Sequence, residues 1–542
     1  MNPSLLRVPA LLALAGFTAC AATRATDEGE VDEAKIDNEL TSNTALARTL
    51  KFQGVVYVAT DATGADIVAA VHHQTQSAFG ALRTAKVGVN SRELKDIDVK
   101  SFVKTKVAVV DAANPTAAAQ PMLRVKYTYT DTALVPKTMA RRSAISLAML
   151  GTDYESHTDR VLAECTAGDK EAHEFLGSIW YVFDPSQSTC APAIAREQKQ
   201  IDADRKKLKS PTTQVTRSEV DRLYVPMTVS LTGDKTNKGT SWPEYDRLFK
   251  GGVQPGKLVI GMVSGKMDDW AAGEHHDTID DVGYDMWMRG LREIRARRPE
   301  LALVSIEGGA DLTRLDVGAV HLTGVTFDDL LAMELDGTFP ASVPGSSQRD
   351  VRVAIGNALF QHWLRFEAPM QVTAGATTRP LTIELDTYFG AETDPTPHKR
   401  AIKNSDVFVY NGHSYIGYGP LDPSNFRASD FPSSYQIMFV NGCVSFNYYE
   451  KDYFTLKSGG TRNLELVTNG LESWVDGSGP AMGRFVGSLI DGKQESYAQL
   501  LTAAQFTDFG YDWGMDALRV VDGELDNVYT PSKTPLALAA AR

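Results

Sequence analysis

The chain has 542 residues, of which 43% are hydrophobic and 23% are charged, and its formal net charge is -13. This length predicts about three domains of roughly 150 residues each, with enough apolar side chains for a sizeable core. The acidic balance is the opposite of the basic surface that contacts phosphates, so we expect no nucleic-acid partner.

The first residues have the pattern of a secretory signal. One positive charge, Arg7, precedes the apolar run 8–17, which is too short to span a bilayer. The run ends in Phe17-Thr18-Ala19-Cys20, which resembles the lipobox of bacterial lipoproteins, where a cysteine becomes the acylated N-terminus. The resemblance implies a signal peptide over 1–20, lipidation of Cys20, and an exported, membrane-anchored lipoprotein facing the periplasm or the cell exterior. Cleavage at the A-x-A-like site Ala19-Cys20-Ala21 is the alternative, and it would release a secreted, soluble protein.

Residues 21–49 are predicted to be an acidic, disordered tether. Positions 27–39 hold seven acidic residues against one lysine and no large apolar cluster, so they bury too little surface to fold. No later stretch approaches the roughly 18 consecutive apolar residues of a membrane-spanning helix. We therefore expect contact with a membrane through the lipid anchor.

Residues 50–209 are predicted to form a smaller α+β domain. Strand-like pieces at 54–59, 123–129 and 179–183 alternate with helical stretches. Cys165 and Cys190 lie close together in this sequence, and in an exported protein they are the natural partners of a disulfide. Cys20 belongs to the signal, so Cys443 is left as a free thiol. Residues 195–219 are charged and broken by proline, which predicts a helix followed by a linker. Residues 210–254 are predicted to be this linker and an entry strand.

Residues 255–475 change to short apolar runs separated by helix-length segments. The runs are 258–263, 301–306, 381–385, 407–410, 437–440 and 464–467. This pattern predicts βα units and a mainly parallel sheet. A helix is predicted over 284–298, and residues 476–542 are predicted to be a C-terminal helical segment packed on this domain.

A group of metal-capable residues lies between the first two runs. The group is Glu274, His275, His276, Asp277, Asp280 and Asp281. Its spacing matches no zinc-protease helix, and adjacent histidines on one helix point to different faces. We expect a solvated polar loop with no metal, and we keep a metal-assisted hydrolase centred on His275 and His276 as an alternative.

Two strand ends carry the strongest chemical signal. The segments are Asn411-Gly412-His413-Ser414, after the run 407–410, and Asn441-Gly442-Cys443, after the run 437–440. In an open parallel sheet, chemistry lies beyond the carboxyl ends of the strands, so His413 and Cys443 meet if the two strands are neighbours. A glycine before each side chain allows a tight turn or the close approach of a substrate. An imidazole beside a thiol can hold it as a reactive thiolate, which predicts a His-Cys dyad.

This arrangement resembles the caspase-like (clan CD) cysteine peptidases, and their gingipain-like branch most, over about residues 255–475. The resemblance implies a three-layer α/β/α domain and a cysteine endopeptidase that acts on protein or peptide substrates without a cofactor. His413 would be the general base and Cys443 the nucleophile, with the backbone N-H groups of Cys443 and of Gly412 or its neighbour as the oxyanion hole. Ser414 stands where the family usually has glycine, so we expect it to disturb the oxyanion geometry.

Two acids, Glu384 and Asp386, lie at the end of the run 381–385, which precedes the run that leads to His413. They could orient His413 or bind a basic side chain of the substrate, and they could equally cap the following loop. A non-catalytic surface binding lipoprotein that keeps the peptidase fold is the main alternative to the enzyme.

Overall fold

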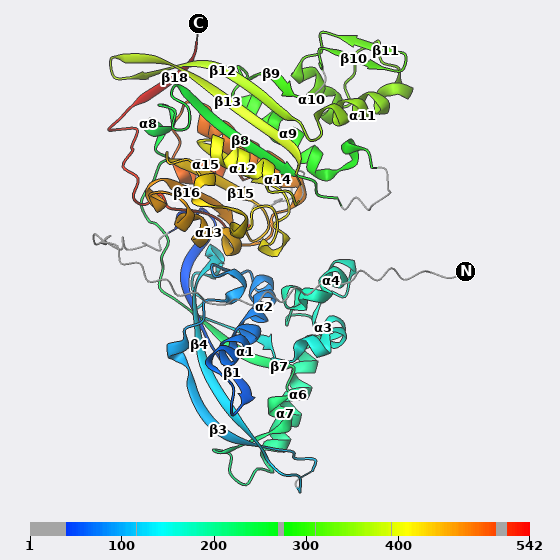
Figure 1. The fold of residues 1–542 in the computed structure, drawn as a ribbon, viewed down its shortest axis with the longest axis vertical. Coiled ribbons are helices and arrows are strands. Elements are labelled where there is room, and N and C mark those ends of the chain that lie inside the picture. The colour runs from blue at the N-terminus through cyan, green and yellow to red at the C-terminus, as the bar shows by residue number, and fades with distance from the viewer. Residues whose placement is uncertain are drawn as a thin grey trace. The chain divides into compact units, whose positions relative to one another are not determined.

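Two large β-sheets with flanking helices, together with a small β-hairpin, form the described part of the chain (Figure 1). This computed structural model describes residues 40–114, 116–268, 276–308, 311–391, 393–505 and 517–541. The chain is a mixed α/β protein, as the sequence predicts. Over these ranges, no helix is both long and apolar enough to cross a membrane.

The first sheet has the strand order β5-β7-β1-β4-β3-β6, with the short β2 also paired to β4. Its strands are β1 (Ala45–Ala59), β2 (Gly88–Val89), β3 (Val103–Val110), β4 (Gln120–Pro136), β5 (Ala144–Leu150), β6 (Gln214–Thr216) and β7 (Tyr224–Thr232). The long strands β1 and β4 are antiparallel, and alternate residues of β1, such as Phe52 and Val56, are buried. These residues share a core with Ile67 and Val71 of α1 (Gly64–Gln76). The opposite face of β1 is more exposed, as the period of two along a strand requires.

The first sheet extends beyond the predicted domain limits of 50–209. β1 begins inside the predicted tether 21–49, and residues 40 and 41 form isolated bridges to Thr236 and Val521. β6 and β7 lie inside the predicted linker 210–254, where pairing with β3, β1 and β5 makes them part of the sheet. The predicted signal 1–20, with Cys20, lies outside the described residues.

The second sheet has the order β17-β16-β15-β14-β8-β13-β12-β18, with β9 also paired to β12. Its strands are β8 (Lys257–Gly265), β9 (Ala302–Glu307), β12 (Trp363–Ala374), β13 (Thr377–Ala391), β14 (Val407–Asn411), β15 (Gln436–Asn441), β16 (Leu464–Asn469), β17 (Arg519–Asp522) and β18 (Leu536–Ala540). The five strands from β13 to β16 across the centre are parallel, and each pairing outside them is antiparallel. All six predicted apolar runs lie in this sheet. The predicted helical segment 476–542 is corrected, because its end forms β17 and β18.

Helices cover both faces of the second sheet. Val407 and Val409 of β14 share one core with α9 (Val282–Arg297) and α14 (Val475–Ile490). Phe408 and Tyr410, which alternate with them, share the other core with α12 (Thr396–Asn404) and α13 (Ser445–Leu456). Burying each such side chain contributes about 1.5–3 kcal/mol, so a strand that is buried on both faces is held firmly.

The remaining helices complete the two layers and the connections. They are α2 (Ala78–Thr84), α3 (Thr158–Cys165), α4 (Lys170–Glu174), α5 (Ile179–Val182), α6 (Cys190–Arg205), α7 (Arg217–Val220), α8 (Tyr245–Leu248), α10 (Phe327–Leu335), α11 (Gln348–Leu359) and α15 (Tyr497–Ala503), and the hairpin is β10 (Arg314–Val317) with β11 (Val320–Thr323). The predicted disulfide is confirmed, since Cys165 at the end of α3 is bonded to Cys190 at the start of α6. The predicted strand 179–183 is instead helical, because the rings of Trp180 and Tyr181 pack against Phe79 of α2.

The two sheets belong to one compact unit, Asn38–Arg542. The segment after β2 contacts α13, where the Asn447 side-chain amide donates to the carbonyl oxygens of Val89 at 3.0 Å and Ser91 at 2.7 Å. The Asn447 side-chain oxygen accepts from the backbone N-H of Glu93 at 3.2 Å. The first sheet is thereby fixed to the helix that follows Cys443.

Candidate active site at the carboxyl ends of two parallel strands

The strands β14 and β15 bring His413 and Cys443 to the same edge of the second sheet. They are parallel neighbours, and their last residues, Asn411 and Asn441, are paired in register. After each strand, one glycine separates the asparagine from His413 or Cys443. The adjacency that the dyad requires is therefore present.

Cys443 lies in a tight turn between a strand and a helix. The next residue, Val444, has φ = 52°, a left-handed conformation that is unusual for a β-branched side chain. Such strain persists where the surroundings enforce it, and here the Val444 N-H donates to the Leu471 carbonyl at 3.0 Å. α13 begins at Ser445, so the positive end of a helix dipole lies beside Cys443 and favours a negative charge there.

A backbone carbonyl orients His413. The His413 Nε2 lies 2.9 Å from the Met267 carbonyl oxygen, in the segment after β8. Because a carbonyl can only accept, this hydrogen bond requires the proton on Nε2 and leaves the lone pair on Nδ1. Met267 is held in turn by the buried Asp281, whose carboxylate accepts its backbone N-H at 3.1 Å. Sequence reasoning missed this support, since an orienting carbonyl has no residue-type signal.

The thiol of Cys443 is free, as predicted, but it is turned toward another neighbour. Its Sγ lies 3.8 Å from the Ser473 carbonyl oxygen. Burial raises the pKa of the Cys443 thiol above its ordinary value, and the Glu472 carboxylate acts in the same direction. The expected lowering of this pKa by His413 is not found in this geometry, and within the described residues no hydrogen bond joins the two side chains. A rotation of the cysteine side chain is needed before the two can exchange a proton.

Ser414 connects the two loops of the site. Its Oγ donates to the Cys443 carbonyl oxygen at 2.6 Å, and Tyr449 donates its hydroxyl to the Ser414 carbonyl at 3.1 Å. Gly442 allows this close approach, because a Cβ there would lie 3.2 Å from the Gly412 carbonyl oxygen. The hydroxyl therefore contacts the carbonyl of Cys443, whereas an oxyanion would be bound by its N-H.

A row of asparagines at the ends of β14, β15 and β16 supports the site, and sequence reasoning missed it. Asn441 donates to the side-chain oxygen of Asn411 at 3.0 Å, and Asn469 at the end of β16 donates to that of Asn441 at 3.0 Å. The buried Arg519 of β17 donates to Asn469 at 3.0 Å and to Asn441 at 3.1 Å. The signal was an Asn-Gly pair repeated after three successive strands, at 411–412, 441–442 and 469–470.

Glu384 and Asp386 do not lie at the edge that carries His413. In the register of the sheet they are opposite Val259 and Gly261, level with the start of β14. His413 follows the end of β14, six residues and about 20 Å farther along. Glu384 is paired with Lys257, and Asp386 accepts two hydrogen bonds from Arg365 at 2.8 and 2.9 Å. Their proposed orienting role is therefore corrected to one in ion pairs within the sheet.

The alternative metal loop is described only in part, because Glu274 and His275 lie outside the described residues, and it stays a prediction. Asp277 and Asp280 are both paired with Arg349 at 2.7 Å. Among the residues that the structure describes, no group of three or more metal-capable side chains is present.

Comparisons with known proteins identify no relative of this chain. Searches against protein-family models, curated proteins and solved structures each find no match. Function must therefore be argued from the site itself, because a fold alone does not specify chemistry.

Proposed function

We propose that this chain is a cysteine endopeptidase with a caspase-like (clan CD) catalytic domain, most similar to the gingipain-like branch. The observation that carries the proposal is the in-register pairing of Asn411 with Asn441, which sets His413 and Cys443 at one edge of the sheet. The helix dipole of α13 and the strained turn at Val444 are further features that suit a nucleophile.

The dyad would act by transfer of the thiol proton to His413. The Cys443 thiolate attacks the peptide carbonyl carbon, and the oxyanion accepts hydrogen bonds from the N-H groups of Cys443 and Gly412. The imidazolium then protonates the departing amine, which leaves a thioester on Cys443. Water, deprotonated by His413, hydrolyses the thioester and releases the acid. Nδ1 is the nitrogen that takes the proton, because Nε2 is bound to Met267.

The proposed setting is outside the cytoplasm. Cys20 would carry the lipid that anchors the protein to a membrane, and substrates would be proteins or peptides on the same side. The bonded Cys165 and Cys190 support an oxidising compartment, since disulfides are rare in the cytosol.

Turnover of a mixed peptide library by the purified chain tests the proposal. We expect Cys443→Ala and His413→Ala each to reduce cleavage by about 10³-fold or more, and the double variant to lose little further, because the pair acts as one unit. His321→Ala, which removes an exposed histidine of the same domain, is the matched control and should cleave as the wild type does. Chelators should leave the activity intact, which separates the dyad from the metal-assisted alternative.

The pH dependence of thiol alkylation provides a second measurement. If His413 accepts the thiol proton, His413→Ala should slow the labelling of Cys443 near neutral pH. The enzyme proposal would be contradicted if the chain cleaves no peptide and if Cys443 is labelled at the same rate in the wild type and in His413→Ala. The raised pKa of Cys443 would then favour the non-catalytic binding lipoprotein.

A further inference from the structure

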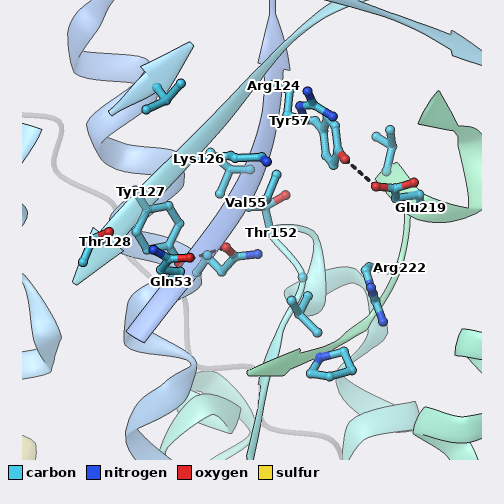
Figure 2. A pocket seen from close by; sticks show the side chains of 18 of the residues that line it. Gln53, Val55, Tyr57, Arg124, Lys126, Tyr127, Thr128, Thr152, Glu219 and Arg222 are labelled. Atoms are coloured by element: carbon cyan, nitrogen blue, oxygen red, sulfur yellow. Dashed lines mark hydrogen bonds between the residues drawn. The ribbon is translucent and has the colours of Figure 1, made fainter. Parts of the chain in front are cut away.

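The first sheet splits between β1 and β7 and leaves a pocket in the gap. The two strands pair from Thr49 with Thr232 to Lys51 with Ser230. Beyond this point β7 continues along β5, while β1 continues along β4. Pro226 of β7 has no N-H to donate to a neighbouring strand, which suits a place where pairing ends. The pocket in this gap has a volume of about 550 Å³ (Figure 2).

Three cationic side chains line the pocket without a carboxylate partner. Arg124 and Lys126 come from β4, where they are opposite Tyr57 and Val55 of β1, on the more exposed face. Arg222 comes from the segment just before β7, and Figure 2 shows it apart from the other two. It donates to neutral acceptors, the Tyr224 carbonyl at 2.9 Å and the Gln198 side chain at 3.0 Å. Within the described residues, none of these three cations forms an ion pair.

The single carboxylate in the pocket wall is already neutralised. Glu219 accepts from Arg205 at 2.9 Å and from the Tyr57 hydroxyl at 2.8 Å. The wall therefore carries a surplus of three positive charges, from four cations and one acid, in a chain whose net charge is -13. The Nε of Arg124 is buried without a hydrogen-bond partner in the described structure. Leaving a buried donor without an acceptor costs free energy, and an anion that accepted from this Nε would remove that cost.

We propose that this pocket binds a small organic anion whose carboxylate or phosphate oxygens accept hydrogen bonds from Arg124 and Lys126, while Arg222 adds positive charge farther along the pocket wall. The volume lies in the range of small-molecule sites. Val55, Val225 and Pro226 supply apolar wall for a carbon skeleton, and Gln53 and Thr152 supply further polar contacts. The site is on the first sheet, so the proposal is independent of the chemistry at Cys443.

Calorimetric titration of the full chain with citrate and, separately, with inorganic phosphate tests the proposal. We expect citrate to bind, and Lys126→Gln and Arg124→Gln each to weaken binding by about ten-fold or more, as for lost hydrogen bonds to charged groups. Raising the salt concentration should weaken binding as well. Tight binding of citrate alone would assign a carboxylate ligand, and tighter binding of phosphate would assign a phosphate ligand; both support the site.

Two further variants keep the result interpretable. Arg124→Lys combined with Lys126→Arg conserves both charges and should retain binding, while Arg141→Gln removes an exposed charge outside the pocket and should bind as the wild type does. Lys126 is exposed, so its replacement should leave the fold intact. Failure of both probes to bind at about 10 mM, or equal binding by Lys126→Gln, Arg124→Gln and the wild type, would overturn the proposal.

Discussion

Ser414 holds together the two loops that carry the proposed dyad. The resembled peptidases usually have glycine at this position, so the resemblance raises the question whether this serine disturbs the oxyanion geometry. In the structure its hydroxyl donates to the Cys443 carbonyl at 2.6 Å. The hydroxyl contacts the carbonyl of Cys443 and not its N-H, so the serine can support the nucleophile's loop without obstructing an oxyanion.

Ser414→Ala tests which of these two effects dominates. Loss of one hydrogen bond should destabilise the fold by about 1 kcal/mol and lower kcat/KM several-fold through looser placement of Cys443. Ser424→Ala, at an exposed serine in the loop that follows His413, is the matched control for both measurements. A more active Ser414→Ala variant would show that the hydroxyl hinders the site, as the sequence suggested.

The sequence could locate His413 and Cys443 but not the groups that orient them. A lone cysteine and a histidine after apolar strands are visible as residue types, and the parallel pairing follows from the pattern of runs. The Met267 carbonyl and the rotation of the Cys443 thiol toward Ser473 depend on backbone paths that leave no such trace. Glu384 was misplaced because β13 continues to Ala391, so the end of an apolar run was not the end of a strand.

At the scale of elements, Arg519 connects the ends of β15, β16 and β17. Burial lowers the pKa of Arg519 to about 10, so the guanidinium is still charged at neutral pH. It donates to side-chain oxygens of Asn441 and Asn469, and Asn469 in turn donates to the Gly442 carbonyl at 3.2 Å. The antiparallel edge strand β17 thus reaches the turn that presents Cys443.

Arg519→Leu should therefore weaken the sheet and the site together. It leaves two buried side-chain acceptors without this donor, which should cost about 2–4 kcal/mol, measured by denaturant unfolding. Arg519→Lys keeps the charge with fewer donors and should lie between the wild type and Arg519→Leu. Equal unfolding midpoints for Arg519→Leu and the wild type would show that the asparagine row does not depend on this residue.

The presence of the central strands was easier to predict than the limits of the strands or the presence of edge strands. The central parallel strands have continuous apolar runs, because both of their faces are buried. β17 and β18 were missed because short edge strands owe their conformation to pairing with β16 and β12. The segment 179–183 has the aromatic composition of a strand, yet packing of Trp180 against α2 favours a helix there.

At the scale of the whole molecule, the start of the described chain is bound to β17 and to the segment just after it. Thr41 is bridged to Val521 of β17, and its hydroxyl donates to the carboxyl of Glu524. Residue 40, beside it, is bridged to Thr236, just after β7. The predicted tether thus ends in a segment that joins both sheets.

Glu524 should make the stability of this junction depend on pH. Burial raises the pKa of Glu524 to about 8, well above its ordinary value of 4.5. Between these two values the folded carboxyl keeps a proton that the unfolded chain releases, so this group lowers stability as pH rises. Its contribution is on the order of 1.4 kcal/mol for each pH unit in that window, and it is constant below and above it.

Glu524→Gln removes the titrating proton while keeping an acceptor for Thr41. We expect the variant to match the wild type near pH 4.5 and to exceed it increasingly toward pH 8, in unfolding free energies measured at each pH. Asp526→Asn, which neutralises an exposed acid two residues away, should follow the wild-type curve. Burial also raises the pKa of Asp406 to about 6 and that of Glu334 to about 7, so the difference between variant and wild type is the informative quantity. A constant difference across pH 4.5 to 8 would show that Glu524 is already ionised when folded, and that its hydrogen bond with Thr41 outweighs its burial.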